Sequence, residues 1–139
     1  MDKGATLRIA ATLKELAAIR QFVEETAAAL KVDPAAIPDV LLAVDEAATN
    51  VIMHGYRGQP GTIEIEMGRD GNSLLVRLRD QATPFDPTVL PPPDVTLPLE
   101  MRPLGGMGVY LIRKLMDAVT HRVTPQGGNE LTLVKKAIA

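Results

Sequence analysis

The sequence predicts an α+β fold, a two-layer sandwich in which a mixed, mainly antiparallel sheet of about five strands is covered on one face by three helices. Two observations lead to this fold class. Five segments have apolar residues at alternate positions, typical of half-buried strands, and three have them three or four positions apart, typical of amphipathic helices. The order strand, two helices, two strands, long loop, helix, two strands suits a single domain over residues 1–139.

Composition excludes several classes of function. The chain has no cysteine, so it can form neither disulfides nor thiolate metal sites, and its two histidines do not have zinc-ligand spacing. The net charge of −2, without a basic cluster, argues against nucleic acid or acidic membranes as partners. No apolar run has the length of a signal peptide core or a membrane span. We therefore expect a cytoplasmic protein that contacts neither nucleic acid nor membrane.

The first elements are a strand and a helix. Residues 7–11 alternate between apolar and other side chains, which predicts a short strand with one buried face. Thr12, followed three residues later by Glu15, has the form of a capping box, and apolar residues with helical period follow it. The pattern predicts a helix over residues 13–30. Pro38 suits the first turn of the next helix, where a missing amide hydrogen costs nothing.

Residues 40–56 predict a second helix with two different sides. Glu46 and Asn50 are one turn apart and point away from its apolar stripe. The pair is either a solvated helix face or part of a site. Gly55 suits the C-cap of this helix, because glycine readily adopts positive φ. The residues of the apolar stripe are Val40, Leu41, Val44, Ala47, Ala48, Val51 and Ile52.

A hairpin follows, with strands at residues 63–68 and 73–80 joined by the turn signal Asp70-Gly71. By parity, Asp80 falls on the same face as Leu74, Val76 and Leu78. An inward carboxylate needs hydrogen-bond donors. Asp80 therefore either binds a partner or, as strand-ending aspartates often do, caps the amides of the following loop.

Residues 81–104 carry seven of the eleven prolines and show no sustained period, which indicates a long loop, either functional or disordered. A glycine-rich turn at residues 105–108 then leads into a helix over residues 109–116. Backbone amides at such a turn can approach a polyphosphate closely, although a short glycine run can also be an ordinary tight turn. Residues 119–124 and 130–136 read as a closing antiparallel pair.

Four motifs in this order resemble the GHKL ATPase superfamily, and the first two are similar to the small anti-sigma-factor serine kinases of bacteria. The resemblance covers nearly the whole chain and implies a Bergerat-type ATP-binding domain, with a lid at residues 81–105. The motifs are Glu46-x-x-x-Asn50 (within the longer run that ends at Tyr56), Asp80-x-Ala82-x-Pro84-Phe85-Asp86-Pro87, Gly105-Gly106-Met107-Gly108, and Asn129-Glu130-Leu131-Thr132-Leu133.

The resemblance implies ATP and Mg²⁺ as cofactors and gives roles to individual residues. Asn50 would ligate Mg²⁺ through its hard oxygen, and Glu46 would be the catalytic base. Asp80 would accept a hydrogen bond from the adenine amino group. From its place before the glycines, Arg102 could reach the terminal phosphate, and Arg57 is a weaker candidate for the same contact. The residues expected to bind the cofactor are Asn50, Asp80, Ala82, Phe85, Arg102, Gly105, Gly106, Met107, Gly108 and Thr132.

The family usually has glycine where this chain has Ala82. If glycine is needed there for positive φ or for close approach to the purine, the methyl group costs about 1 kcal/mol. The resemblance implies a protein serine kinase that acts as an anti-sigma factor, phosphorylates an anti-sigma-factor antagonist, binds a sigma factor or similar regulator, and forms a homodimer. Two alternatives stay open: a binding module of the same fold without phosphate transfer, and the catalytic domain of a split histidine kinase.

Overall fold

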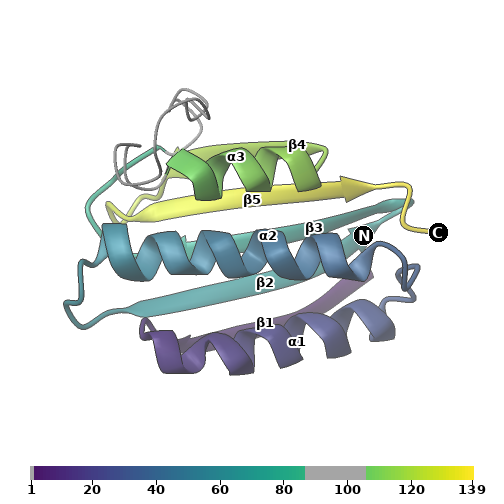
Figure 1. The fold of residues 1–139 in the computed structure, drawn as a ribbon, viewed down its shortest axis with the longest axis horizontal. Coiled ribbons are helices and arrows are strands. Elements are labelled where there is room, and N and C mark those ends of the chain that lie inside the picture. Colours follow the sequence, from purple (N-terminus) through teal and green to yellow (C-terminus); the bar gives the residue numbers. More distant parts are fainter. Residues whose placement is uncertain (1, 87–105) are drawn as a thin grey trace.

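The protein is a two-layer sandwich of one sheet and three α-helices (Figure 1). The computed structural model describes residues 2–86 and 106–139. Its five strands follow the spatial order β1-β2-β3-β5-β4, and each of the four pairings is antiparallel. The strands are β1 (Asp2–Ala10), β2 (Thr62–Asp70), β3 (Ser73–Asp80), β4 (Ala118–Val123) and β5 (Asn129–Lys136).

The helices lie side by side on one face of this sheet (Figure 1). This arrangement confirms the predicted α+β sandwich. None of the helices in the described ranges is long and apolar enough to cross a membrane. The helical elements are η1 (Leu13–Glu15), α1 (Leu16–Ala29), α2 (Ile37–Asn50), η2 (Val51–Gly55) and α3 (Gly106–Leu115).

The core fills the space between the two layers. Ile63, Ile65 and Met67 of β2 are fully buried, as are Val40 and Val44 of α2. On β3, buried and half-buried residues alternate along the whole strand, and the last buried position is Asp80. The predicted inward parity of Asp80 is therefore confirmed, and it puts a carboxylate at the end of the helix-covered face.

The opposite face of the sheet carries a network of ion pairs centred on Arg79. Its guanidinium binds Glu64 at 2.9 Å, Glu66 at 3.0 Å and Glu130 at 2.7 Å. Arg122 binds the second carboxylate oxygen of Glu130 at 2.7 Å. Glu130 is buried beneath these two arginines, and their hydrogen bonds lower its pKa to about 2. The two arginines and three glutamates of this network therefore neutralise one another's charge in large part.

The start of the first helix differs from the prediction. The side chain of Thr12 makes no capping hydrogen bond, so the predicted capping box is wrong. Instead, the carbonyl of Thr12 accepts the amide of Glu15 at 3.0 Å and closes a 3-10 turn. The α-helix begins only at Leu16, because this tighter turn has already used the backbone groups that the box would have satisfied.

The end of the second helix differs more. The α-helix ends at Asn50, and a π-turn, η2, follows it directly. In this turn the Tyr56 amide donates to the Val51 carbonyl at 2.8 Å. Gly55 does not have positive φ, so its predicted C-cap role is wrong; the left-handed residues are Arg57 (φ 53°) and Gly58 (φ 81°). A wider turn therefore leads from Asn50 toward β2.

Candidate functional site

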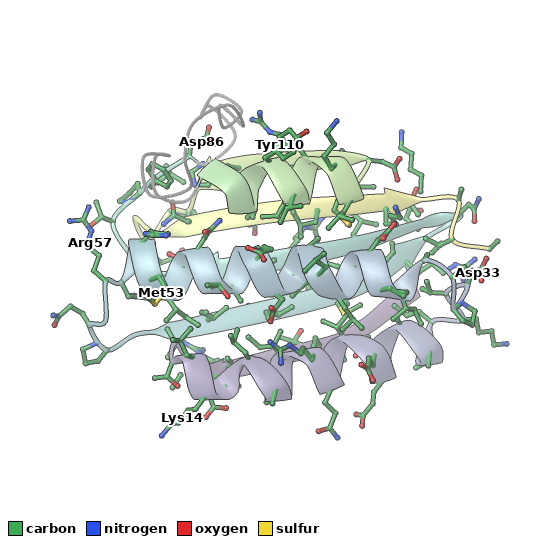
Figure 2. The ribbon with its side chains drawn as sticks, viewed as in Figure 1. Lys14, Asp33, Met53, Arg57, Asp86 and Tyr110 are labelled. Carbon is green, nitrogen blue, oxygen red and sulfur yellow. The ribbon has the colours of Figure 1, made fainter. Side chains whose placement is uncertain are left out.

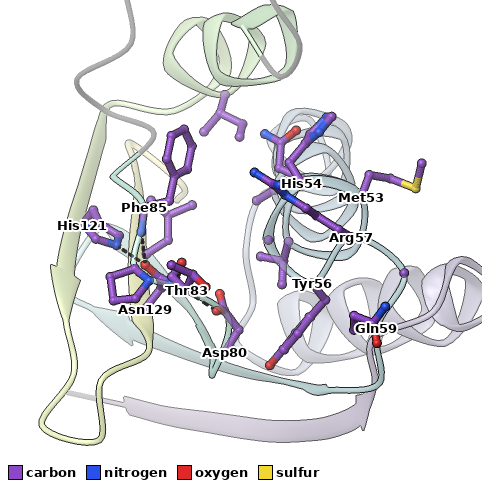
Figure 3. Close-up of a pocket in the computed structure, with 18 residues that line it drawn as sticks. Met53, His54, Tyr56, Arg57, Gln59, Asp80, Thr83, Phe85, His121 and Asn129 are labelled. Carbon is purple, nitrogen blue, oxygen red and sulfur yellow. Dashed lines mark hydrogen bonds between the residues drawn. The ribbon is translucent and has the colours of Figure 1, made fainter.

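A cavity opens where the ends of α2, β3 and β5 meet (Figure 3). Asn50, the last residue of α2, lines it from the helix layer, and Asp80, the last residue of β3, lines it from the sheet. The two polar groups on which the predicted nucleotide site depends thus face one space. Ile112 of α3 and Leu131 of β5 contribute apolar walls, which suit the flat ring of a ligand.

Asp80 has one oxygen held by the protein. Its Oδ1 accepts the Ala82 amide at 2.9 Å and Nδ2 of Asn129 at 2.9 Å. No described residue bonds the other oxygen, Oδ2, which leaves it available as an acceptor on the cavity side. The residue is only 5% exposed, and this burial raises its pKa, opposed by the two hydrogen bonds and by the nearby His121. Asp80 both caps the following loop and offers an acceptor to a ligand.

Asn129 holds this part of the site together (Figure 3). Besides Asp80, its Nδ2 bonds the carbonyls of Ala82 at 3.3 Å and Thr83 at 3.4 Å, while its Oδ1 accepts the Phe85 amide at 2.9 Å. We did not predict Asn129 as a site residue, although it opens the fourth motif. Its role comes from the register of β3 and β5, in which it lies opposite Asp80.

Ala82 does not occupy the cavity. It is buried, its backbone φ is not positive, and its side chain does not line the cavity. Its methyl group instead packs against the π-turn, since a Cβ atom placed on Gly55 would lie 3.2 Å from the Ala82 Cβ. The expected penalty of positive φ therefore does not arise at Ala82.

Residues of the second motif also line the cavity near its opening. Phe85 is 54% exposed and lines the cavity, together with Thr83 and Pro84. Its backbone amide is fixed by Asn129, so the ring stands on an anchored loop although it is itself accessible. An exposed ring beside a polar pocket can cover a bound planar group by stacking.

Besides Ala82, Glu46 and Thr132 are predicted residues that do not line the cavity. Glu46 is half-buried one helical turn before Asn50 and is not among the lining residues. Thr132 alternates with Leu131 and pairs with Arg77, which puts it on the far face of the sheet. The geometry therefore does not bring Thr132 to the site. The motif alone does not predict this, because it does not take strand parity into account.

The glycine-rich motif is partly described. Gly106, Met107 and Gly108 form the first turn of α3, and so do not precede the helix as predicted. A helix N-terminus leaves amide hydrogens unpaired by the helix itself, which is compatible with the predicted phosphate contact. Gly105, Arg102 and most of the predicted lid lie outside the described residues.

The π-turn and the residues just after it bring two more side chains to the cavity: His54, which the sequence did not assign to a site, and Arg57, a weaker candidate than Arg102 for the terminal phosphate. His54 and Arg57 line the cavity and lie across it from Asp80 and Asn129 (Figure 3). Figure 2 shows Arg57 beyond the end of α2. It is the only lysine or arginine among the described residues that line the cavity.

Comparison with known proteins assigns the family. The model of the histidine kinase-like ATPase domain matches residues 9–135, a range that includes every residue lining the cavity. The chain belongs to the histidine kinase-like ATPase family. The family resemblance inferred from the four motifs is thereby confirmed.

Named relatives of this histidine kinase-like ATPase domain are serine-protein kinases. RsbW of Bacillus thuringiensis (strain Al Hakam) is 37% identical over 87 residues, which cover 60% of this chain and 54% of that relative. RsbW of Bacillus anthracis is 36% identical over the same coverage. The chain therefore spans about half the length of the curated relatives it matches.

A solved structure has the same fold. The crystal structure of the RsbU and RsbW domains of Rv1364c from Mycobacterium tuberculosis matches with a TM-score of 0.63 and 19% identity. The match covers 95% of this chain and 32% of that chain. At this level of identity, the likeness shows the fold of the histidine kinase-like ATPase domain and nothing about its partners.

Proposed function

We propose that this chain is an ATP-dependent protein serine kinase that acts as an anti-sigma factor in the cytoplasm. It phosphorylates an anti-sigma-factor antagonist on serine and binds a sigma factor or similar regulator. The observation that carries the proposal is the convergence of Asn50 and Asp80 on one cavity, in a chain of the histidine kinase-like ATPase family. The names of the RsbW relatives support serine as the acceptor.

The donor set of the cavity fits Mg-ATP. Asp80 keeps one carboxylate oxygen toward the cavity, where it can accept the amino group of adenine. The side-chain oxygen of Asn50 is a hard donor that suits Mg²⁺, with phosphates and water as the other ligands. Among the described residues, no three carboxylate, histidine or cysteine side chains form a metal cage, so the nucleotide would have to contribute ligands.

Glu46 is the proposed catalytic base. It stands one helical turn from Asn50, close to the place where the phosphates of a bound nucleotide would reach the end of α2. It would take the proton of the acceptor serine while the serine oxygen forms a bond to the terminal phosphorus and ADP leaves. Its position outside the cavity lining suits a residue that meets the second substrate rather than the nucleotide.

Phosphate transfer to the cognate antagonist tests this assignment. We expect Glu46→Gln to reduce transfer by at least about 100-fold, the usual contribution of a general base, while ATP still binds. The matched control is Glu24→Gln, the same change at an exposed position of α1. Equal transfer by wild type and Glu46→Gln would show that Glu46 is not the base.

The same experiment separates the alternative functions. Acid-stable phosphate on serine is expected, whereas phosphate on histidine of another chain would identify the domain as part of a split histidine kinase. A binding module without transfer would leave the antagonist unmodified. The reason to consider this alternative is Ala82 in place of the family's usual glycine, and Ala82 does not have positive φ.

The proposal includes a homodimer through β1 and α1. β1 is an edge strand of the described sheet, with β2 as its only partner, so its outer backbone groups can pair with another chain. Sedimentation of the purified chain over a range of concentrations tests this part. A species of one chain at all concentrations would exclude the dimer.

A further inference from the structure

His121 is a buried polar side chain to which no role has been assigned. It lies on β4 opposite Leu131, on the helix-covered side of the sheet, and its side chain is 5% exposed. It lines the cavity, and its Nε2 is 2.7 Å from Oδ1 of Asn129 (Figure 3). Burial of an imidazole against a ligand cavity requires a specific set of partners.

The hydrogen bonds determine which ring nitrogen carries hydrogen. Oδ1 of Asn129 can only accept, and it already accepts the Phe85 amide. Nε2 of His121 must therefore donate to it. The other ring nitrogen, Nδ1, faces Asp86 at 3.8 Å. Among the described residues, the charged groups near the imidazole include Asp80 and Asp86.

These two donors orient the Asn129 amide. With Oδ1 held by His121 and by the Phe85 amide, Nδ2 must point to Asp80. If the amide were reversed, its oxygen would face the Asp80 carboxylate, and its NH₂ would face two donors. Loss of the donor on His121 or on Phe85 makes the reversed Asn129 amide less costly. In that reversed state, Asp80 would have to turn away from the amide oxygen or accept a proton.

We propose that His121 is a positioning residue for the recognition of 6-aminopurine nucleotides. By donating to Asn129 it holds Oδ1 of Asp80 in the protein network and leaves Oδ2 to accept the amino group of the base. This inference rests on the proposed binding of ATP in the cavity. It deepens that proposal by tracing base selectivity to a residue that does not itself touch the amino group.

The ligand chemistry follows from the acceptor. A purine with a 6-amino group donates to Asp80, whereas one with a 6-oxo group puts an oxygen against a carboxylate. A site that forms a hydrogen bond to a polar group of its ligand strongly rejects an analogue without that group. An apolar pocket that merely surrounds the group discriminates much less. Wild type should therefore bind Mg-ATP more tightly than Mg-inosine triphosphate, and the difference should depend on His121.

Binding of the two nucleotides to His121→Leu and His121→Gln tests the proposal by titration calorimetry. Leucine removes the donor, and we expect the affinity for ATP to fall by about 10-fold while that for inosine triphosphate changes little. Glutamine can present an amide NH₂ where Nε2 lies, so His121→Gln should keep most of the selectivity. Thermal unfolding of each variant verifies that it is folded during the titration.

The outcomes separate this inference from the proposed function. Loss of selectivity in His121→Leu together with its retention in His121→Gln supports the positioning role. Equal weakening of both nucleotides, or unchanged selectivity in His121→Leu, overturns it while the proposed function stands. If wild type binds no ATP, the proposed function fails and this inference fails with it.

Discussion

The hydroxyl of Tyr56 joins the end of the π-turn to the loop that follows Asp80. It accepts a hydrogen bond from the Gln81 amide at 2.7 Å and donates one to the Thr62 carbonyl at 2.8 Å. The ring leans on Gly61, where a side chain would overlap it. The segment leading from Asn50 and the segment leading from Asp80 are thereby tied to each other at the floor of the cavity.

Removal of this hydroxyl should loosen the tie. We expect Tyr56→Phe to lower the free energy of unfolding by about 1 kcal/mol, because a backbone amide and a carbonyl both lose a partner. Nucleotide affinity should also fall, by a few-fold. Tyr110→Phe is the matched control, since this half-buried tyrosine on α3 has a Lys114 ammonium over its ring but no hydrogen bond to a described residue through its hydroxyl. Equal effects of the two changes on chemical denaturation would contradict the role of Tyr56.

The contact between Gly55 and Ala82 predicts a compensating pair. Gly55→Ala puts a Cβ 3.2 Å from that of Ala82, which is tighter than an ordinary contact, so we expect a loss of about 1 kcal/mol or more. Adding Ala82→Gly makes room and should restore part of the stability. A double-mutant cycle from urea denaturation should give a coupling of at least about 0.5 kcal/mol. Additive effects would show that the two residues do not constrain each other.

Glu130 predicts a loss of stability in acid. Its folded pKa of about 2 lies below the ordinary value of 4.5, because Arg79 and Arg122 hold the ionised form. Its stabilisation is therefore fully present above about pH 4.5 and is lost as pH falls toward 2, with a size of at most about 3 kcal/mol. Glu130→Gln should remove this part of the pH dependence of the unfolding free energy. An unchanged pH profile would contradict the assignment, and Glu64→Gln, at the more exposed edge of the network, should change it less.

The sequence predicted what depends on local pattern. Alternation located four strands to within two residues at each end, whereas β1 begins five residues before the predicted strand. Parity put Asp80 on the covered face. Features that depend on contacts between residues far apart in the sequence were not predicted. Gly55 of the π-turn lies against Ala82 of a distant loop, and Asn129 meets Asp80 only through the register of β3 and β5. Thr132 was chosen from a motif without regard to the face on which it lies.

The central claim is that Asp80 selects the base of a nucleotide bound beside Asn50. Asp80→Asn keeps an oxygen for Asn129 and the Ala82 amide but replaces the cavity acceptor with a donor. Since it also removes a buried charge whose pKa is raised by burial, the variant should be at least as stable as wild type at neutral pH.

The most direct measurement is calorimetric titration of wild type and Asp80→Asn with Mg-ATP and with Mg-inosine triphosphate. We predict that the variant loses at least about 100-fold in affinity for ATP and gains relative preference for inosine triphosphate, because its amide can donate to a 6-oxo group. Binding of ATP by Asp80→Asn with the affinity of wild type would contradict the claim.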